Sequence, residues 1–172
     1  MPDRRRLAVV ALVAVLVVGG VAVVTNPGLL PVGEYDRTTV TAVDAESGES
    51  LATVQVRVAD TRQKRYVGLS ETNELGADEG MLFVHDDEGE YAYVMRGMAF
   101  PLDIVFVDAD GTVTRIHRAE LSPADGSGSD RTRYRGRGKY VLEVPLGYTD
   151  EHGIEPGDRL RIPEPWGPTP GT

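Results

Sequence analysis

The chain has 172 residues, no cysteine, and 27 acidic against 18 basic residues, for a net charge of −9. This length predicts one domain with appendages, since domains typically contain about 100 to 150 residues. The lack of cysteine excludes disulfides, thiol nucleophiles and thiolate metal ligands, and a polyanion is a poor partner for nucleic acid, whose phosphates attract basic surfaces. Only Lys64 and Lys139 are lysines, and an acidic, lysine-poor surface predicts a halophilic source.

The amino terminus carries a strong membrane signal. Arg4–Arg6 precede a run from Leu7 to Val24 that contains only Leu, Ala, Val and Gly. A charge-free run of about 18 residues is the length at which a transmembrane helix is expected, and positive residues stay on the cytoplasmic side. We therefore expect a single-pass membrane protein whose remaining residues lie outside the cytoplasm. The alternative is a signal peptide cleaved near Gly20–Ala22, after which the chain is secreted.

The chain divides into four segments. Residues 1–25 form the membrane anchor or signal segment, and the Pro- and Gly-rich residues 26–35 form a linker. Residues 36–163 form an exported β domain, and the proline-rich residues 164–172 form a disordered tail.

Strand patterns begin directly after the linker. Residues 38–43 and 51–58 flank a short polar turn and predict a hairpin, because valines alternate with polar residues in the second run. Residues 61–68 lack this alternation, follow the candidate caps Asp60 and Thr61 and end at a glycine, which predicts a short helix.

The middle of the chain predicts three strands in close succession. Two apolar runs flank the acidic turn Asp86–Gly89, and a third run, Leu102–Val107, follows a rigid corner at Pro101. A turn at residues 108–111 then leads into a further strand at 112–117.

Residues 121–138 contain many Gly and Ser residues but no apolar run, which predicts a mobile loop. Its arginines and the neighbouring Arg118 form the one basic patch on this acidic chain. The loop arginines are Arg131, Arg133, Arg135 and Arg137. They either pair with the acidic surface or contact an anion or a lipid headgroup.

Strands at 140–144 and 159–162, with a turn or one helical turn at 147–153 between them, complete the domain. In total, about eight short strands and one or two brief helices predict a mainly β domain, either barrel-like or a sandwich. The transmembrane helix precedes this domain.

Several blocks of the chain occur together in a known family. They are GMLF at 80–83 and PLDIVF at 101–106, accompanied by Arg65, Gly68-Leu69, Met95-Arg96, Asp110-Gly111, Val141-Leu142-Glu143 and Gly157-Asp158. In this order and with these gaps, residues 54–162 resemble domain of unknown function 192, an uncharacterised family. The resemblance implies a small, β-rich single domain without an established activity. Ser70 replaces a usual Met of the family pattern, and Arg96 keeps only the positive charge of a usual Trp-Met-Lys-Asn run.

Three charged residues interrupt apolar segments: Arg96, Asp103 and Glu143. Alternation puts Asp103 on the same face as Val105 and Glu143 on the same face as Val141, so both carboxylates lie on core faces. If the three charged residues meet, one carboxyl pKa would rise and suit general acid or base catalysis, because two like charges cannot both ionise cheaply. The alternative is a structural ion pair that fixes the strand register.

Two weaker sets of residues could bind metals. The acidic turn offers oxygen ligands for calcium or magnesium; the candidates are His85, Asp86, Asp87 and Glu88. We interpret this turn as a solvated tip, because it lacks the spacing of a calcium loop. Soft ligands for copper could come from Met81, Met95, Met98, His85 and His117. Methionines in apolar strands more often fill cores, so we expect neither metal nor cofactor.

Two functions remain open at this point. The first is a membrane-tethered, extracytoplasmic β domain that acts as a binding or envelope-accessory module, since the sequence contains no catalytic motif. The second is a hydrolase-like enzyme that uses the carboxylate pair Asp103 and Glu143 with Arg96. In either case we expect a monomer that contacts the membrane through its amino-terminal helix, and no nucleic-acid partner. The ligand or protein partner stays unidentified.

Overall fold

The computed structural model describes residues 32–121 and 132–168, which form one β domain with two short helices. The elements are β1 (Asp36–Val43), β2 (Ser50–Ala59), α2 (Arg62–Val67), β3 (Glu79–Tyr93), β4 (Leu102–Val107), β5 (Val113–Ala119), β6 (Tyr134–Pro145), α3 (Tyr148–Glu151) and β7 (Arg159–Arg161). The predicted membrane segment lies outside the described residues. No helix in the described part of the chain is long and apolar enough to span a membrane.

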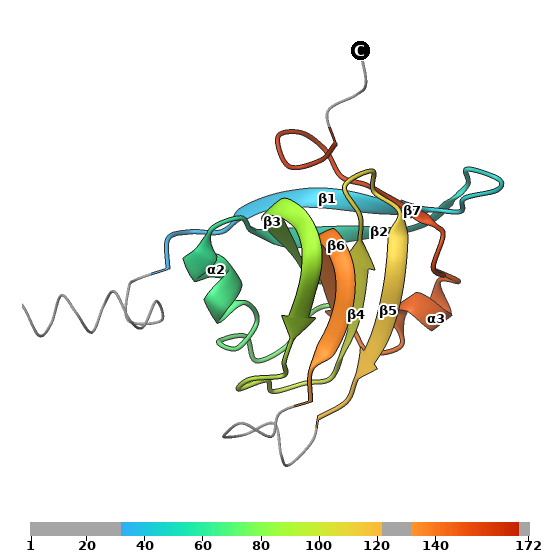
Figure 1. Ribbon diagram of the computed structural model, residues 1–172. Helices are drawn as coiled ribbons and strands as arrows, with labels where there is room; N and C mark the ends of the chain where they lie inside the picture. Colours follow the sequence, from blue (N-terminus) through green and yellow to red (C-terminus); the bar gives the residue numbers. More distant parts are fainter. Residues whose placement is uncertain (1–31, 122–131, 169–172) are drawn as a thin grey trace, which may run out of the picture.

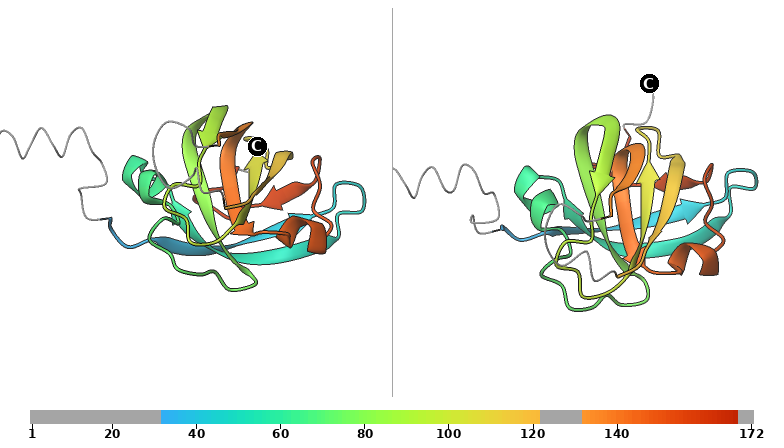
Figure 2. Two further views of the ribbon diagram at one scale, coloured as in Figure 1. Left: turned by 90° about the horizontal axis from the view of Figure 1, so that it is seen from below. Right: turned by 60° about the horizontal axis from the view of Figure 1, so that its bottom comes forward.

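The seven strands form one sheet in the order β5-β4-β6-β3-β2-β1-β7. The sheet curls into a half-barrel (Figures 1 and 2), and an isolated bridge between Thr112 and Arg159 joins its two edges at one end. The mainly β prediction is confirmed, with a single curled sheet in place of a sandwich. Figure 1 shows α2 and α3 at opposite ends of this sheet.

Most of the predicted local elements are present. The β1–β2 and β4–β5 pairs are antiparallel hairpins, and α2 has the predicted ends. The Thr61 side chain accepts a hydrogen bond from the Lys64 amide at 3.2 Å, and Gly68 ends the helix with a positive φ. The β2–β3 pair, however, is parallel. Parallel neighbours need a long crossover, and residues 60–78, including α2, provide it.

The predicted acidic hairpin at 86–89 is wrong, because β3 runs through this segment as one bent strand. Its pairing with β6 shifts register between Val84 and Gly89, so the acidic residues lie at a bulge. The strand β6 begins at Tyr134, inside the predicted loop, and residues 134–138 pair with residues 89–93 of β3. The structure therefore replaces two predicted strands and part of a loop with one long, curled strand pair.

Contacts between distant residues hold this curled pair in place. Arg137 Nε lies 2.7 Å from Glu88 Oε1, so one predicted loop arginine pairs with the acidic segment. Arg118 likewise pairs with Asp150 of α3. Gly136 lets the curled segment approach the core, because a Cβ at this position would lie 2.5 Å from Cγ of Phe106. Local sequence patterns do not predict these contacts, because the residues that meet lie far apart in the chain.

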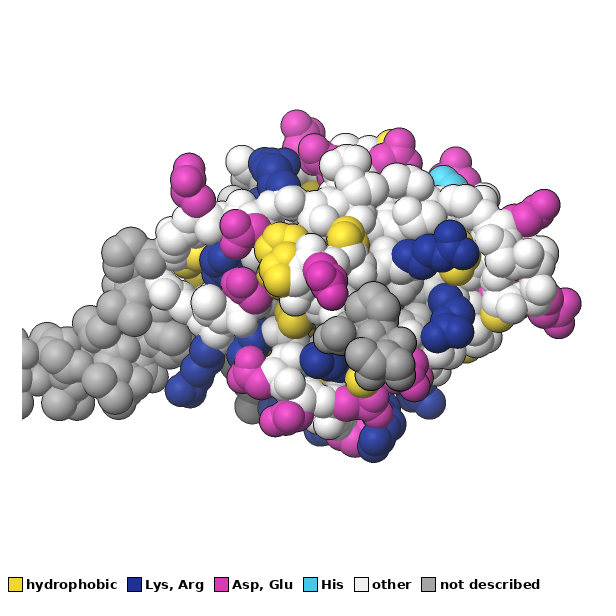
Figure 3. Space-filling view, turned by 90° about the horizontal axis from the view of Figure 1, so that it is seen from above, with side chains coloured by type: hydrophobic (Ala, Val, Ile, Leu, Met, Phe, Trp, Pro, Cys, Tyr) yellow, Lys and Arg dark blue, Asp and Glu magenta, His cyan; other side chains and the backbone are white. Residues whose placement is uncertain are grey.

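Two clusters of buried apolar residues lie on opposite faces of the sheet. The inner core, on one face, receives side chains from all seven strands, including Val40, Val54, Leu82, Val105, Val113, Leu142 and Leu160. The outer core, on the other face, contains Met81, Phe83, Ile104, Phe106 and Val141, together with Leu69 and Met95 from connecting segments. Charged side chains spread over the exterior, and Figure 3 shows acidic groups along the edge of one face with Lys and Arg between them.

The predicted tail lies within the described residues only up to residue 168. Residues 163–167 form a turn in which the amides of Trp166 and Gly167 donate to the Pro163 carbonyl. Trp166 is partly buried against the inner core, which gives this segment a packing contact that proline content alone does not reveal.

Candidate functional site

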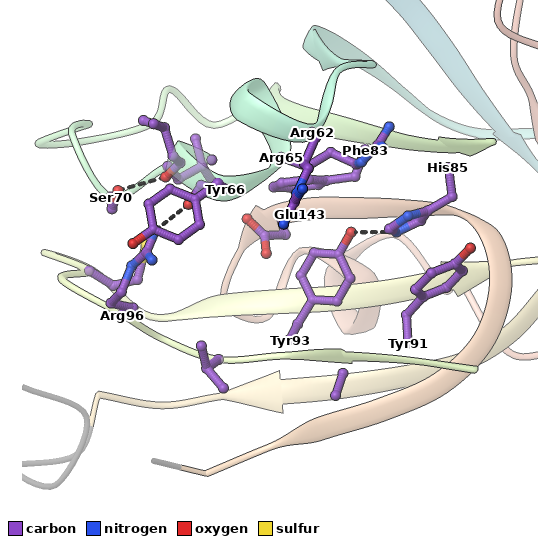
Figure 4. Close-up of a pocket in the computed structure, with 16 residues that line it drawn as sticks. Arg62, Arg65, Tyr66, Ser70, Phe83, His85, Tyr91, Tyr93, Arg96 and Glu143 are labelled. Atoms are coloured by element: carbon purple, nitrogen blue, oxygen red, sulfur yellow. Dashed lines mark hydrogen bonds between the residues drawn. The ribbon is translucent and has the colours of Figure 1, made fainter. Parts of the chain in front are cut away.

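A pocket of about 540 Å³ opens on the outer face of the sheet, between α2 and the curled part of β3 (Figure 4). Glu143 of β6 and Phe83 of β3 are buried at its base. Figure 4 shows His85 and Tyr91 at one end of the pocket and Arg96 at the other. The remaining wall comes from α2, through Arg62, Arg65 and Tyr66.

The bend of β3 creates this pocket. Residues two apart in a strand point to one face, so Tyr91 and Tyr93 both face the pocket from the curled half of β3. The bend brings that half over the first half of the same strand. The ring of Tyr93 therefore packs edge-on against Phe83, with centroids 5.1 Å apart at an interplanar angle of 84°. The result is a recess with aromatic walls.

The carboxyl group of Glu143 is the most unusual feature of the pocket. Glu143 pairs with Ile104 on one neighbouring strand and Met81 on the other, so its side chain shares their apolar face. Only 7% of the residue is exposed, and within the described residues the carboxyl has no hydrogen-bond or ion-pair partner. Burial raises the pKa of Glu143 to about 8. The group is therefore a neutral carboxylic acid near pH 7 and can donate a hydrogen bond.

A histidine–tyrosine pair lies beside this carboxyl. The hydroxyl of Tyr93 and Nε2 of His85 are hydrogen bonded at 3.0 Å, and the imidazole stacks on Tyr91 with ring centroids 3.5 Å apart. Burial, followed by the positive charge of Arg65, lowers the pKa of His85 to about 4. Burial also raises the pKa of Tyr93 well above its ordinary value, and the charge of Glu143 adds to this effect. Both groups are neutral over the physiological range.

Three arginines surround the pocket. Arg65 Nη1 donates to the carbonyl oxygens of Asp60 and Val84 at 2.9 and 2.6 Å, which fixes its position. Arg96 stacks over the Tyr66 ring at 3.9 Å and donates to the Tyr66 carbonyl. Arg62 has no hydrogen-bond or ion-pair partner among residues 32–121 and 132–168. With Glu143 and His85 neutral, the lining carries three positive charges.

Asp103 does not belong to this site, and the predicted cluster of three charges is wrong in that respect. Opposite Asp103 on β6 lies Val144, whereas Glu143 lies opposite Ile104, so the two carboxyl groups point to opposite faces. Oδ2 of Asp103 accepts hydrogen bonds from the Gly147 amide at 3.1 Å and from the Thr149 amide and hydroxyl at 2.9 and 2.7 Å. Asp103 thus holds the start of α3 against the inner core.

Glu143 and Arg96, the other two predicted residues, both line the pocket. They do not form an ion pair: Arg96 is bound to Tyr66, and the charge of Arg96 is not among the causes that set the pKa of Glu143. The structure therefore brings two of the three predicted residues to one site, without the contact that the sequence suggested.

Comparison with known proteins identifies the family. The model of DUF192, described as an uncharacterized ACR, matches residues 42–162. The chain belongs to the DUF192 family. The resemblance seen in the sequence is thereby confirmed, and the family description provides no activity. No curated protein matches the chain.

Two solved structures are similar to this DUF192 protein. A proposed transcription regulator from Sinorhizobium meliloti has 27% sequence identity and a TM-score of 0.66; the match covers 76% of this chain and 97% of that one. A protein of unknown function from Novosphingobium aromaticivorans has 30% identity and a TM-score of 0.62, with 77% of this chain and 90% of that one covered.

Three of the four weak metal candidates in the acidic segment of this DUF192 domain, His85, Asp86 and Glu88, have other side-chain partners. Within the described residues, no group of three or more His, Asp or Glu side chains is placed to hold a metal ion. Glu88 accepts from Arg137 and from the Ala109 amide, and His85 bonds Tyr93. The proposed copper ligands have other packing roles: Met81 and Met95 are buried in the outer core, Met98 packs against that core and lines the pocket, and His117 bonds the Arg135 carbonyl.

The sequence analysis missed most of the aromatic wall of the site. Tyr91 and Tyr93 have the two-residue spacing of a strand, but the predicted hairpin put a turn directly before them. Arg65 was noted only as part of the family pattern. The available signal was the combination of an aromatic pair on one strand face and a lone carboxyl on another apolar strand.

Proposed function

We propose that this protein is a membrane-tethered, extracytoplasmic binding module, and that it binds a small ligand in the pocket above Glu143. The observation that carries this proposal is a nearly buried carboxyl without a partner at the base of an open, aromatic-lined pocket. Ligand sites are concave and mostly apolar, with a few polar groups that orient the ligand. Glu143, Tyr93 and His85 are such groups here.

The direction of the Glu143 carboxyl supports this assignment. It has no protein partner among the described residues and opens into the pocket, so a ligand there can accept its hydrogen bond. The mouth of the pocket also exposes apolar surface, because Tyr66 and Val94 are 41% and 37% exposed and both line it. A bound ligand would cover these side chains.

The binding role can be tested by closing the pocket. Val94→Trp should fill its mouth and abolish the binding of small fragments, because the indole would occupy space that a ligand needs. Leu121→Trp is the matched control, since Leu121 is also exposed, at 47%, and is absent from the pocket lining. Saturation-transfer NMR of the full chain in lipid nanodiscs, with a mixed fragment library, provides the measurement. If no fragment distinguishes the two variants, the pocket is not a ligand site.

The location of the module rests on the amino-terminal sequence. Arg4–Arg6 and the apolar run to Val24 favour an anchor with the positive residues inside. We expect the protein to sediment with membranes, and protease added to intact cells to remove the folded domain. Cleavage of a cytoplasmic marker protein in the same cells would reveal lysis and serves as the control. Recovery of the intact protein only in the soluble cytoplasmic fraction would contradict this location.

A second candidate function is an enzyme in which Glu143 acts as a general acid. The pKa of about 8 favours it, because a catalytic acid works best when its pKa lies near the operating pH. The paired-carboxylate mechanism is not retained, since Asp103 faces the inner core. Mass spectrometry of a bound fragment after long incubation separates the two functions: a binding module returns it unchanged, whereas an enzyme converts it and Glu143→Gln abolishes the conversion.

The description of the Sinorhizobium relative as a transcription regulator does not fit this chain well. The net charge of −9 on the present chain opposes contact with nucleic-acid phosphates. The acidic exterior instead suits a domain that must remain dispersed in a salt-rich medium outside the cell.

A further inference from the structure

We propose that the pocket binds a small anion with a planar apolar body, an aromatic carboxylate being the simplest example, and that the Glu143 carboxyl donates a hydrogen bond to the anion. This inference rests on the proposed binding function and adds the chemical class of the ligand. It follows from the charges, the hydrogen-bonding groups and the aromatic rings that face the pocket.

The charges of the pocket favour an anion. Its lining contains three arginines and one acidic residue, and that acid is neutral near pH 7, within a chain of net charge −9. Two backbone carbonyls fix the position of Arg65. Burial is the largest cause of the lowered pKa of His85, and the charge of Arg65 is the second. Its positive field therefore reaches the interior of the pocket, and the exposed Asp86, whose Oδ2 lies 3.8 Å from Nη2 of Arg65, offsets only part of it. Arg62 is exposed and free of partners within the described residues, so it can approach a ligand.

The buried carboxyl favours the same ligand class. A neutral carboxylic acid in an apolar site donates a strong hydrogen bond to an oxyanion. To pair with a cation, Glu143 would first have to ionise in a buried position, and burial opposes that ionisation. The arginines of the lining would also repel a cationic ligand. Donation by Glu143 needs no such change, and Figure 4 shows its carboxyl directed into the pocket.

The aromatic rings determine the body of the ligand. Phe83, Tyr91 and Tyr93 line the pocket, and Tyr66 is half-exposed at its mouth. Rings of this kind prefer offset-stacked or edge-on contacts with other planar groups. His85 already lies parallel to the Tyr91 ring, with centroids 3.5 Å apart and an interplanar angle of 9°. A planar apolar body would extend the same arrangement.

The test compares three probes of one shape and different charge: benzoate, benzamide and benzamidine. Their affinities for the full chain in neutral lipid nanodiscs are measured by isothermal titration calorimetry. We expect benzoate to bind at least about tenfold more tightly than benzamidine at pH 7. Val94→Trp, which closes the mouth, should abolish the binding, and Leu121→Trp should preserve it.

The pH dependence identifies the donor. Six groups face the Glu143 side: Arg62 and Arg65 from α2, His85, Tyr91 and Tyr93 from β3, and Arg96 from the following segment. His85 is neutral well below pH 7, and burial holds the pKa of Tyr93 well above 10. Glu143 loses its proton near pH 8. Benzoate should therefore bind about tenfold or more weakly at pH 9.5 than at pH 7, since a carboxylate then faces a carboxylate.

Two variants distinguish the hydrogen bond donated by Glu143 from the attraction of the arginine charges. Glu143→Gln keeps a donor, so it should retain benzoate binding near the wild-type level at pH 7 and lose the decrease between pH 7 and 9.5. Arg62→Gln should weaken benzoate binding about two- to fivefold. Arg37→Gln removes the same charge from an exposed position of β1 outside the pocket lining and should have no effect.

The outcomes distinguish this inference from the proposed function. If benzamidine binds most tightly, and its binding strengthens above pH 8 and disappears in Glu143→Gln, the pocket is a cation site and the anion inference is overturned. Equal binding of benzamide and benzoate also overturns it. In both cases a loss of binding in Val94→Trp would leave the binding function intact. If none of the probes binds at about 10 mM, and no library fragment responds to Val94→Trp, both proposals fail.

Discussion

Glu143→Gln should stabilise the protein relative to wild type as the pH rises, by about 4 kcal/mol at pH 9 compared with pH 5. The pKa of Glu143 is about 8 in the folded state, against an ordinary value of 4.5. The folded protein thus holds this proton more tightly than the unfolded chain does. The stabilisation is complete below pH 4.5 and is lost as the pH rises to about 8, at about 1.4 kcal/mol per pH unit.

Urea unfolding of the full chain at a series of pH values measures this effect. The quantity of interest is the change with pH in the difference between variant and wild type, because the cost of burying an amide is the same at every pH. His85 has the opposite pH dependence. Because its pKa is lowered to about 4 in the folded state, the folded protein loses stability as the pH falls below 6.5. His85 is present in both proteins, so its effect cancels. Glu90→Gln, at an exposed position of β3, is the control and should give a flat difference. A flat difference for Glu143→Gln as well would show that the carboxyl is solvated or paired.

Asp103→Ala should lower the free energy of unfolding by about 3 to 5 kcal/mol, because it leaves two buried donors and one part-buried donor without an acceptor. These donors are the amides of Gly147 and Thr149 and the hydroxyl of Thr149, all bound to Oδ2 of Asp103. Asp103→Asn keeps an oxygen acceptor and should cost roughly half as much, since hydrogen bonds to charged acceptors are about twice as strong as neutral ones.

Two controls give this result its meaning. Asp150→Ala removes an exposed carboxylate from the same helix, one that pairs with Arg118 at the surface, and should cost less than about 1 kcal/mol. Adding Arg96→Met to Asp103→Ala should restore nothing, because the two residues belong to different faces of the sheet. Recovery of stability in the double variant would mean that Asp103 and Arg96 are paired after all.

The pocket and the Asp103 network illustrate how one sheet separates two roles. Neighbouring positions on β4 and β6 alternate between the inner and outer cores, so Asp103 stabilises the fold while Glu143 faces the pocket. Each carboxyl interrupts an apolar strand in the same way. What distinguishes them is the supply of donors: the start of α3 provides three donors to Oδ2 of Asp103, although Oδ1 has none, and within the described residues no side chain or amide bonds the Glu143 carboxyl.

Features that depend on neighbours along the chain could be predicted before the structure was known. Apolar runs bounded by turn residues, with alternation in β2, identified strands β1, β2, β4 and β5. Alternation put Asp103 on the face of Val105 and Glu143 on the face of Val141, and these two valines lie in opposite core clusters. Thr61 and the glycine at 68 defined the helix α2, because caps act within one turn. The motif blocks identified the family.

The tertiary structure alone decided which strands pair and in what register. Alternation assigns the side chains of one strand to two faces, but it does not show which of these faces a neighbouring strand shares. A register shift of one residue moves every side chain of a strand to the other face of the sheet. The register that puts Ile104 opposite Glu143 therefore separates the two carboxyl groups that the sequence analysis combined. The acidic segment 86–89 reads locally as a turn, yet pairing of the following residues with residues 134–138 makes it a bulge within a single strand. That bulge folds Tyr93 over Phe83 and forms the pocket, and it exists only because segments more than forty residues apart lie side by side.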